Sequence, residues 1–413
     1  MVRLVFGWIL AVSALTAGMG EIPQAEYRAR REALRKALNG VVVLFGQRET
    51  NDEIFRFQQE PNFLYLSGWV EPGAILLITP SKDGLFLPHH NERAERFLGK
   101  RASAEDHDTF AVTGFEHVYP IERFEAELAD ALNQSEKLYS LPTAAWNAKL
   151  AAFYPLREIS DPSSALSKLR VRKSAAEIDA IQHATDVTLS GHRAAWKRIA
   201  AGLYEYQLGA TLANAYLEQG CEALAYSPIV GSGKNGTVLH YFGGQRRMDQ
   251  GDLVVMDSAA QCNNYASDIT RTIPVNGKFS PRQRELYEIV LGAQKAAIDA
   301  IKPGIRISGE GETLTKIVKD YFNAHGKDLQ GEPLGKYFIH GLGHPVGLQV
   351  HDPQAGEPLE AGMVVTMEPG LYIPGESIGI RIEDVVLVTE KGAKVMSAAL
   401  PREPDEIEKA LAK

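Results

Sequence analysis

The sequence predicts an α+β protein of two domains. The prediction rests on the length of the chain, on short apolar runs between helical stretches, and on a strong helix start in mid-chain. At 413 residues the chain is longer than one hydrophobic core usually extends. With 45% hydrophobic and 23% charged residues, its composition is that of a globular protein. The net charge of −8 and the absence of a basic stripe argue against nucleic acid or a membrane surface as a stable partner.

Residues 1–20 have the layout of a secretory signal peptide. Arg3 supplies positive charge, Leu4–Leu15 is an apolar run too short for a comfortable transmembrane helix, and small residues follow up to Gly20. An uncleaved membrane anchor is the alternative. We expect cleavage and export, so that the mature protein is periplasmic or secreted.

Residues 21–172 form the first expected domain, of α/β type. Its strand candidates are Gly40–Phe45 and Ala74–Ile78, which are apolar runs bounded by glycine or proline. Residues 160–164 are interpreted as a loop near the domain boundary, because Asp, Pro and Ser fill that stretch.

The second domain is expected over residues 173–402, followed by a C-terminal tail at residues 403–413. Ser174 and Glu177 have the spacing of a capping box, in which each side chain bonds the other residue's backbone N–H. Apolar residues then recur at helical spacing, so a long helix is predicted to open this domain.

The second domain contains a weak internal repeat. Gly251–Asp257 and Gly362–Glu368 each begin with glycine, continue as an apolar strand and end in a carboxylate. In each copy a second strand follows with another acid, Asp268 in one and Glu383 in the other. The pattern predicts a duplicated unit that brings four acids to a common centre. Chance similarity between two short hairpins is the alternative.

These four acids predict a metal site. A carboxylate among apolar strand residues is costly to bury without a partner, and Arg271 and Arg381 could serve only two of the four. Two divalent cations would neutralise their formal charge of about −4. One added imidazole gives five ligands and leaves room for a water between the ions. Such oxygen-rich ligands favour Mn²⁺, with Zn²⁺ or Co²⁺ as alternatives.

Three histidines, His340, His344 and His351, lie within one glycine-rich stretch. The first two are four residues apart, as in a zinc-binding helix. No Glu follows His340, and Gly341 and Gly343 disfavour a helix there. We therefore expect a loop and strand in which the histidines need not share one face.

Two further features receive no functional assignment. Cys221 and Cys262 are the only cysteines and could form one disulfide, so both are interpreted as structural. His89 and His90 are interpreted as ordinary histidines, because the sequence shows no pattern of acids around them.

The ordered set Asp257, Asp268, His344, Glu368 and Glu383 resembles the dinuclear metallopeptidases of the pita-bread fold. The flanking motifs are V-M-D, S-D-I-T-R-T, H-G-L-G-H, M-E-P-G-L-Y and G-I-R-I-E-D. Residues 62–68, N-F-L-Y-L-S-G, look like the N-terminal domain of Xaa-Pro aminopeptidases. The resemblance covers residues 25 to 400. It implies a duplicated, curved antiparallel sheet with helices on the outside, preceded by the smaller α/β domain.

The resemblance also implies how the ligands are shared. Asp257 and Asp268 would bind one metal and His344 and Glu368 the other, while Asp268 and Glu383 bridge the pair. The implied reaction is hydrolysis of the bond between an N-terminal residue and a following proline, by a hydroxide held between the two divalent metals. Peptides with proline in second position are therefore the expected partners.

Other matching positions receive roles from the same resemblance. Glu368 would carry the proton of the attacking water to the proline nitrogen, and His240 and His351 would stabilise the intermediate and contact the substrate. Tyr226 and Ile229 would line the proline pocket, and His340 would border the site. Arg381 would orient a ligand carboxylate from behind it.

Two rival functions stay open. The loops around the ligands are short, and Pro345 and Gln349 stand where a bulky residue and an acid are common in the family, which leaves an Xaa-Pro dipeptidase (prolidase) as the first alternative. A metal-free relative, either a creatine hydrolase or a non-enzymatic module, is disfavoured because all five ligands are present. The resemblance is compatible with a homodimer or a homotetramer.

Overall fold

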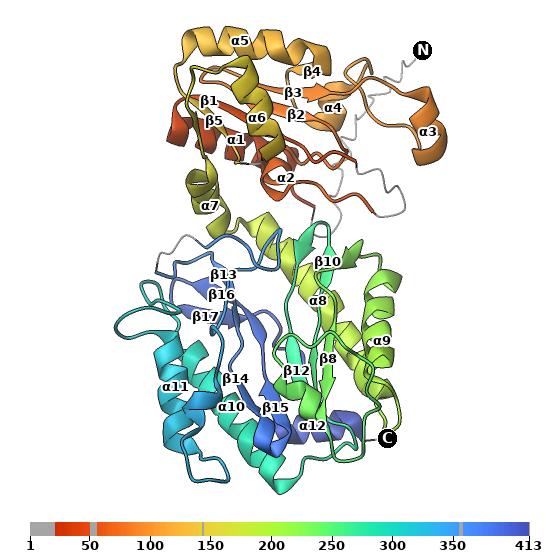
Figure 1. Ribbon diagram of the computed structural model, residues 1–413, viewed down its shortest axis with the longest axis vertical. Helices are drawn as coiled ribbons and strands as arrows, with labels where there is room; N and C mark the ends of the chain where they lie inside the picture. Colours follow the sequence, from red (N-terminus) through yellow and green to blue (C-terminus); the bar gives the residue numbers. More distant parts are fainter. Residues whose placement is uncertain (1–20, 50–55, 143, 355–357, 413) are drawn as a thin grey trace, which may run out of the picture.

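The computed structural model describes residues 21–49, 56–142, 144–354 and 358–412. The predicted signal peptide lies outside this part of the chain. Two domains are stacked along the long axis, with helix α7 (Ser163–Val171) between them (Figure 1). The expected two-domain α+β organisation is therefore observed. No helix in the described ranges is both long and apolar enough to cross a membrane.

The N-terminal domain is built on a six-stranded mixed sheet in the order β4-β3-β2-β1-β5-β6. Its strands are β1 Val41–Phe45, β2 Ile75–Ile78, β3 Asp83–Leu87, β4 Val118–Pro120, β5 Leu138–Ser140 and β6 Ile159–Ser160. Its helices are α1 Gln24–Leu38, α2 Pro61–Ser67, α3 Glu92–Leu98, α4 Thr109–Thr113, α5 Phe124–Gln134 and α6 Ala144–Phe153, with a 3₁₀ turn η1 at Ile121–Arg123. Both strands expected from the sequence, β1 and β2, form.

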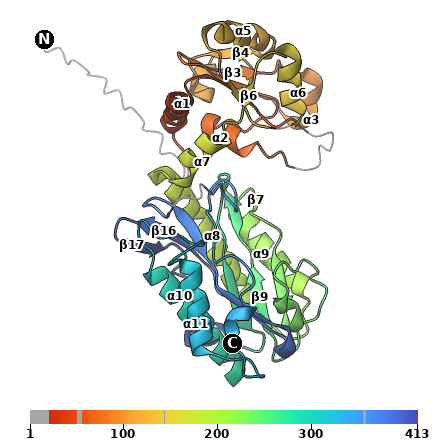
Figure 2. The ribbon, with the colours of Figure 1, turned by 60° about the vertical axis from the view of Figure 1, so that its left-hand side comes forward.

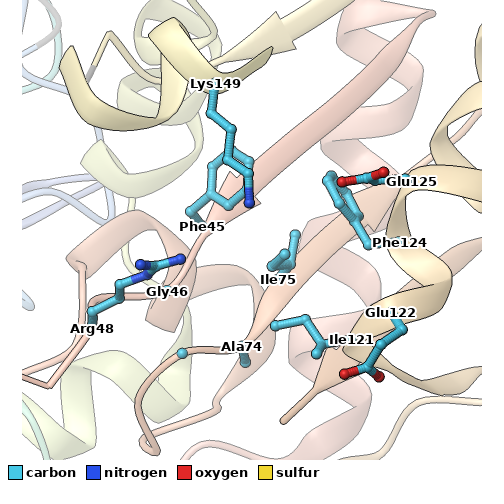
Figure 3. A pocket seen from close by; sticks show the side chains of 11 residues that line it. Phe45, Gly46, Arg48, Ala74, Ile75, Ile121, Glu122, Phe124, Glu125 and Lys149 are labelled. Carbon is cyan, nitrogen blue, oxygen red and sulfur yellow. The ribbon is translucent and has the colours of Figure 1, made fainter. Parts of the chain in front are cut away.

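Strand β1 is apolar throughout because helices cover both faces of its sheet. Val42 and Leu44 pack in the core with α1 and α2, whereas Val41 and Val43 pack in the core with α5 and α6. A small cavity of about 100 Å³ lies at the edge of the second core. Its lining combines an apolar part with charged side chains such as Arg48, Lys149 and Glu125 (Figure 3).

The boundary between the domains is more helical than expected. The predicted loop at residues 160–164 ends early, because α7 already begins at Ser163, where Asp161 Oδ1 accepts a hydrogen bond from the Ser163 backbone N–H at 2.8 Å. After a short break, the capping box of Ser174 and Glu177 forms as predicted and opens α8 (Ala175–Arg198).

The second domain contains four small antiparallel sheets enclosed by helices (Figure 1). Its strands are β7 Ala223–Leu224, β8 Ile229–Ser232, β9 Leu253–Asp257, β10 Ala260–Cys262, β11 Tyr265–Ala266, β12 Thr270–Pro274, β13 Val364–Met367, β14 Gly370–Ile373, β15 Ile378–Arg381, β16 Asp384–Thr389 and β17 Gly392–Val395. Besides α8, its helices are α9 Glu205–Glu218, α10 Pro281–Asp299, α11 Leu314–His325 and α12 Pro404–Leu411, with 3₁₀ turns η2 Gly233–Thr237, η3 Leu334–Tyr337 and η4 Pro374–Glu376.

The predicted repeat is visible in this arrangement. Strand β9 pairs with β12, and β13 pairs with β16, both antiparallel. A packed helix pair precedes each hairpin, α8 with α9 and α10 with α11. The two helix pairs lie on opposite outer sides of the strands (Figure 2). The second domain is therefore a duplicated unit whose apolar strands meet in the middle.

Residues 403–413, expected as a tail, contain helix α12 instead. Ile407 and Leu411 are four residues apart on one face of this helix, and both are buried in the core of the domain. On the outer face, Asp405 and Glu408 pair with Arg284 of α10. Cys221 and Cys262 form a disulfide that joins the segment after α9 to β10, which agrees with their structural interpretation.

Candidate metal centre

The two hairpins place the four predicted acids at equivalent positions. Asp257 ends β9 and Glu368 directly follows β13, whereas Asp268 and Glu383 come just before the returning strands β12 and β16. A backbone hydrogen bond of 3.0 Å from Glu383 N–H to Thr270 O joins the two halves at this point. All four carboxylates consequently line one cavity of about 410 Å³.

His344 completes the set, and its tautomer can be inferred from its contacts. Its Nδ1 lies 3.1 Å from the Pro345 carbonyl oxygen, which can only accept, so Nδ1 carries the hydrogen. Its Nε2 lies 3.4 Å from Asp268 Oδ2 and 3.5 Å from Glu368 Oε1. Once the ring loses its second proton, the bare Nε2 faces two carboxylates, which is the arrangement of a metal-binding histidine.

The donor spacing fits a divalent cation. Asp268, His344 and Glu383 each offer one ligand atom, and these atoms lie within 4.8 Å of one another. Ligands about 2.0–2.2 Å from a common ion are separated by about 3–4 Å, so small side-chain movements suffice to bind one. The other candidate group in the described ranges, His183 with Cys221 and Cys262, has its sulfurs in the disulfide.

The electrostatics of the metal-free site also call for cations. Burial, together with repulsion from neighbouring acids, raises the pKa of Glu368 to about 7, and the same causes raise the pKa of Asp257 and, well above its usual range, that of Glu383. Burial lowers the pKa of His344, but its hydrogen bond to Asp268 and the nearby negative charges outweigh burial and raise it to about 9. Protons therefore take the place that metal ions would fill.

Only one of the two arginines expected near the acids contacts any of their carboxylates, although Arg271 Nη1 donates to the Glu383 backbone carbonyl oxygen at 2.6 Å. Arg381 Nη2 donates a hydrogen bond of 2.5 Å to Asp257 Oδ2. Arg271 instead pairs with Asp384 at 2.7 Å, and both of these side chains are fully buried. The expectation that Arg271 could neutralise one of the four acids is therefore wrong. The guanidinium of Arg271 is neutralised instead by Asp384, the first residue of β16, which follows Glu383 in the sequence.

Arg381 also begins a hydrogen-bonded chain that sequence reasoning missed. Its Nη1 donates to the Tyr372 hydroxyl oxygen at 2.8 Å, and that hydroxyl lies 2.9 Å from His340 Nε2. His340 Nδ1 lies 2.7 Å from the Gly341 carbonyl oxygen and must carry the hydrogen, so Nε2 accepts from Tyr372. Burial lowers the pKa of His340 to about 4, which keeps this ring neutral. The sequence feature that could have indicated this chain is Tyr372, the last residue of the M-E-P-G-L-Y motif.

Tyr226 and Ile229, predicted to line a proline pocket, both line the cavity. The Tyr226 hydroxyl also lies against Asp257 and, at 2.5 Å, against Asp268 Oδ1. Burial and the neighbouring acids raise its pKa well above the usual value, so the phenol stays protonated and holds these carboxylates.

The two predicted catalytic histidines stand at the open side of the cavity. The ring centres of His344 and His351 are 4.0 Å apart, and partial burial together with the charge of His344 lowers the pKa of His351. His240 is exposed, near Phe242, whose side chain is 64% exposed. Every site residue expected from the sequence therefore lines this cavity, and Leu239, Phe242, Val350 and Gln354 are additions to the lining.

His89 and His90 do have acids around them, contrary to the expectation. His89 lies between Glu105, at 2.5 Å, and Glu122, at 2.7 Å, while His90 contacts Glu95 and Asp106. These acids come from separate segments of the N-terminal domain. Glu95 lies only five residues from His90 and could be seen in the sequence, whereas the other three acids lie 16 to 33 residues from their histidines and are brought there by the fold.

Two family models match the chain: metallopeptidase family M24 over residues 179–390, and the aminopeptidase P N-terminal domain over residues 27–139. The chain belongs to metallopeptidase family M24. The predicted family, the hydrolase class and the pita-bread fold are thereby confirmed. Membership of a metallopeptidase family, together with the match to a Zn-substituted structure, supports divalent metal ions as the cofactor.

Several relatives and solved structures match this metallopeptidase over nearly its whole length, and one relative matches little more than half of it. The Xaa-Pro aminopeptidase of Haemophilus influenzae is 34% identical, over 95% of this chain and 98% of its own. The Xaa-Pro dipeptidase of Pyrococcus furiosus is 39% identical, over 58% of this chain and 66% of its own. The solved proline aminopeptidase P II from Yersinia pestis is 29% identical with a TM-score of 0.83, covering 94% of this chain and 99% of that one. The same TM-score and identity hold for a Zn-substituted Escherichia coli aminopeptidase P in complex with product, over 95% of this chain and 98% of that one.

Metal binding to the metal-free metallopeptidase should release protons near neutral pH. His344, with its pKa of about 9, is protonated there and must lose that proton to bind a metal ion. Apparent affinity should therefore increase as pH rises toward 9. Calorimetric titration with Mn²⁺ in buffers of different protonation enthalpy measures the release.

In the same titration, the His344→Ala variant is the control. It should release about one proton fewer per site, since its site lacks the group that titrates. Equal proton release by the two proteins would show that His344 is not the group displaced.

Proposed function

We propose that this metallopeptidase is an Xaa-Pro aminopeptidase, which removes an N-terminal residue when proline follows it. The observation that carries the proposal is the complete five-ligand set in one cavity. Support also comes from relatives named Xaa-Pro aminopeptidase, which match both domains of the chain.

The chemistry of the bond explains what the side chains must do. The nitrogen of an Xaa-Pro bond belongs to a tertiary amide without an N–H, and as a leaving group it must receive a proton. Two divalent ions, when bound, polarise the scissile carbonyl group and lower the pKa of water. Glu368, which directly follows β13 and lines the cavity, would accept a proton from that water and pass it to the proline nitrogen.

The histidines at the open side act on the substrate in this proposal. Because its pKa is lowered, the His351 ring is neutral near pH 7 and offers an N–H to the developing oxyanion. His240 contacts the substrate from the segment after η2, which is separate from the loop of His351. Ile229 supplies apolar surface for the proline ring. Arg381 and Tyr372 hold Asp257 and His340 in place behind the site.

We propose Mn²⁺ as the native metal, because the donors are four carboxylates and one imidazole with no thiolate. An Xaa-Pro dipeptidase is the second candidate, favoured by the match to the Pyrococcus furiosus relative, which leaves more than a third of this chain uncovered. The full-length matches to aminopeptidases favour our first candidate.

Peptide length should separate the two candidates. With Mn²⁺ supplied, we expect the purified protein to cleave Xaa-Pro-Pro tripeptides and longer Xaa-Pro peptides at least as well as Gly-Pro, since the cavity opens to solvent at His240 and His351. Chromatography monitors the release of the first residue, in parallel reactions that contain Mn²⁺, Zn²⁺ or Co²⁺. These rates measure both the preferred peptide length and the preferred metal. Activity confined to dipeptides would make the protein a prolidase.

The two neighbouring histidines should differ in what their loss removes. His344→Ala should lower metal content, because the Nε2 donor is lost, whereas His351→Ala should keep the metal and lower kcat by about 10²–10³-fold. Elemental analysis of both variants after Mn²⁺ loading, with kcat measured on the same samples, tests this. Equal metal loss in the two variants would contradict the division of roles.

We also propose that the protein is exported, on the basis of Arg3 and the apolar run Leu4–Leu15, with the disulfide as support because such bonds persist in oxidising compartments. Intact mass of the protein from the extracytoplasmic fraction should correspond to a chain that starts near Glu21. A full-length chain retained in the cytoplasm would refute export. The homodimer or homotetramer stays a prediction, which light scattering on the same material decides.

A further inference from the structure

The loop that carries His351 is closed on itself. The backbone N–H of Asp352 bonds Pro345 O at 3.0 Å, and Gly347 N–H bonds Gln349 O at 3.0 Å. Two backbone hydrogen bonds tie the turn to the rest of the domain: Ala266 N–H donates to Gly347 O at 2.8 Å, and Val346 N–H donates to Val364 O at 3.0 Å. His351 itself is exposed at the edge of this loop. Its position against His344 therefore depends on what holds the loop.

The centre of the loop is held by a buried ionic cluster. Asp352 Oδ1 accepts from Arg170 Nη2 at 2.6 Å, and Asp352 Oδ2 accepts from Lys173 Nζ at 3.0 Å. The three side chains are 2%, 1% and 0% exposed. A Cβ at Gly347 would stand 2.7 Å from Asp352 Oδ2, so the glycine leaves the room that the carboxylate occupies.

Arg170 donates to three side chains in two parts of the molecule. Besides Asp352, it donates to Gln349 Oε1 at 3.0 Å in the loop and to Asn62 Oδ1 at 2.8 Å on α2 of the N-terminal domain. Arg170 itself belongs to α7, the helix between the domains. The planar fork of a guanidinium suits this geometry, because it fixes the directions of several acceptors at once.

Stability alone does not account for such a cluster. Desolvating three charges costs about as much as their attraction returns, and apolar residues of similar volume would serve a core at least equally well. What a buried ionic cluster provides is a defined relative position of its members. Here that position relates the N-terminal domain to the loop of His351.

We propose that Arg170 is a positioning residue for the hydrolytic reaction, which holds His351 in place through Asp352 and so makes the N-terminal domain part of the catalytic apparatus. The inference rests on the proposed role of His351 in turnover. Arg170 does not line the cavity, so its effect on the reaction can only be indirect.

The first test compares Arg170→Met with Arg170→Lys. Arg170→Met should lower kcat on an Xaa-Pro tripeptide by about 10²-fold at unchanged metal content, the scale expected when a reacting group is misplaced by about 1 Å. Arg170→Lys should recover part of this loss, because a lysine keeps the charge on Asp352 but cannot reach all three acceptors. The KM should change much less than kcat.

A double-mutant cycle with His351→Ala distinguishes positioning from a general structural role. If Arg170 acts through His351, then Arg170→Met should reduce kcat by less than about 3-fold in the His351→Ala background. A matched control is Arg31→Met, since Arg31 forms a largely buried ion pair with Asp83 within the N-terminal domain, away from the loop. It should lower the thermal unfolding temperature and leave kcat unchanged.

The outcomes separate this inference from the function on which it rests. If His351→Ala lowers kcat but Arg170→Met adds its full loss to it, Arg170 does not act through His351 and the inference is wrong. Loss of metal in Arg170→Met would equally overturn it. Wild-type turnover in His351→Ala would refute the proposed role of His351 first, and the inference with it. Should Arg170→Met fail to fold, the same cycle with Arg170→Lys decides.

Discussion

The mutual repulsion of four buried carboxylates is the constraint on which the rest of the catalytic domain depends. Two hairpins of apolar strands bring Asp257, Asp268, Glu368 and Glu383 into one cavity, where burial raises the pKa of three of them. Such a cluster is tolerated only with cations or protons present. The ligand nitrogen of His344, the single arginine contact and the phenol of Tyr226 all follow as partners of these four charges.

A second layer of side chains converts this charge cluster into a site of defined geometry. Arg381 binds Asp257 and Tyr372, Tyr372 binds His340, and Thr270 donates a hydrogen bond of 2.7 Å to Glu383. Arg381, Tyr372 and Thr270 lie on strands β15, β14 and β12, which fix their positions. The groups at the open side, His240 and His351, are exposed and lie on loops, so their positions depend on those loops.

Sequence patterns predicted the parts of this structure that depend on local order. The apolar runs of β1 and β2, the glycine-to-carboxylate spacing and the capping box at Ser174 are properties of short segments, and all appear as expected. Pairings between distant segments could not be predicted in the same way. Asp384 takes Arg271 because β16 and β12 meet in space, and the acids around His89 come together only through the fold. The spacing of Ile407 and Leu411, four residues apart, is typical of an amphipathic helix and could have predicted α12, which the tail interpretation missed.

The hydrogen bond from Glu383 to Thr270 places the site across the seam of the duplication, with two acids on each side. A chain in which only one half has folded offers one pair of carboxylates, too few to hold two divalent ions. Binding of two divalent ions would therefore require that both halves have docked. For the same reason, the seam cannot open appreciably in the loaded state without releasing its ions, and occupancy protects the whole domain against unfolding.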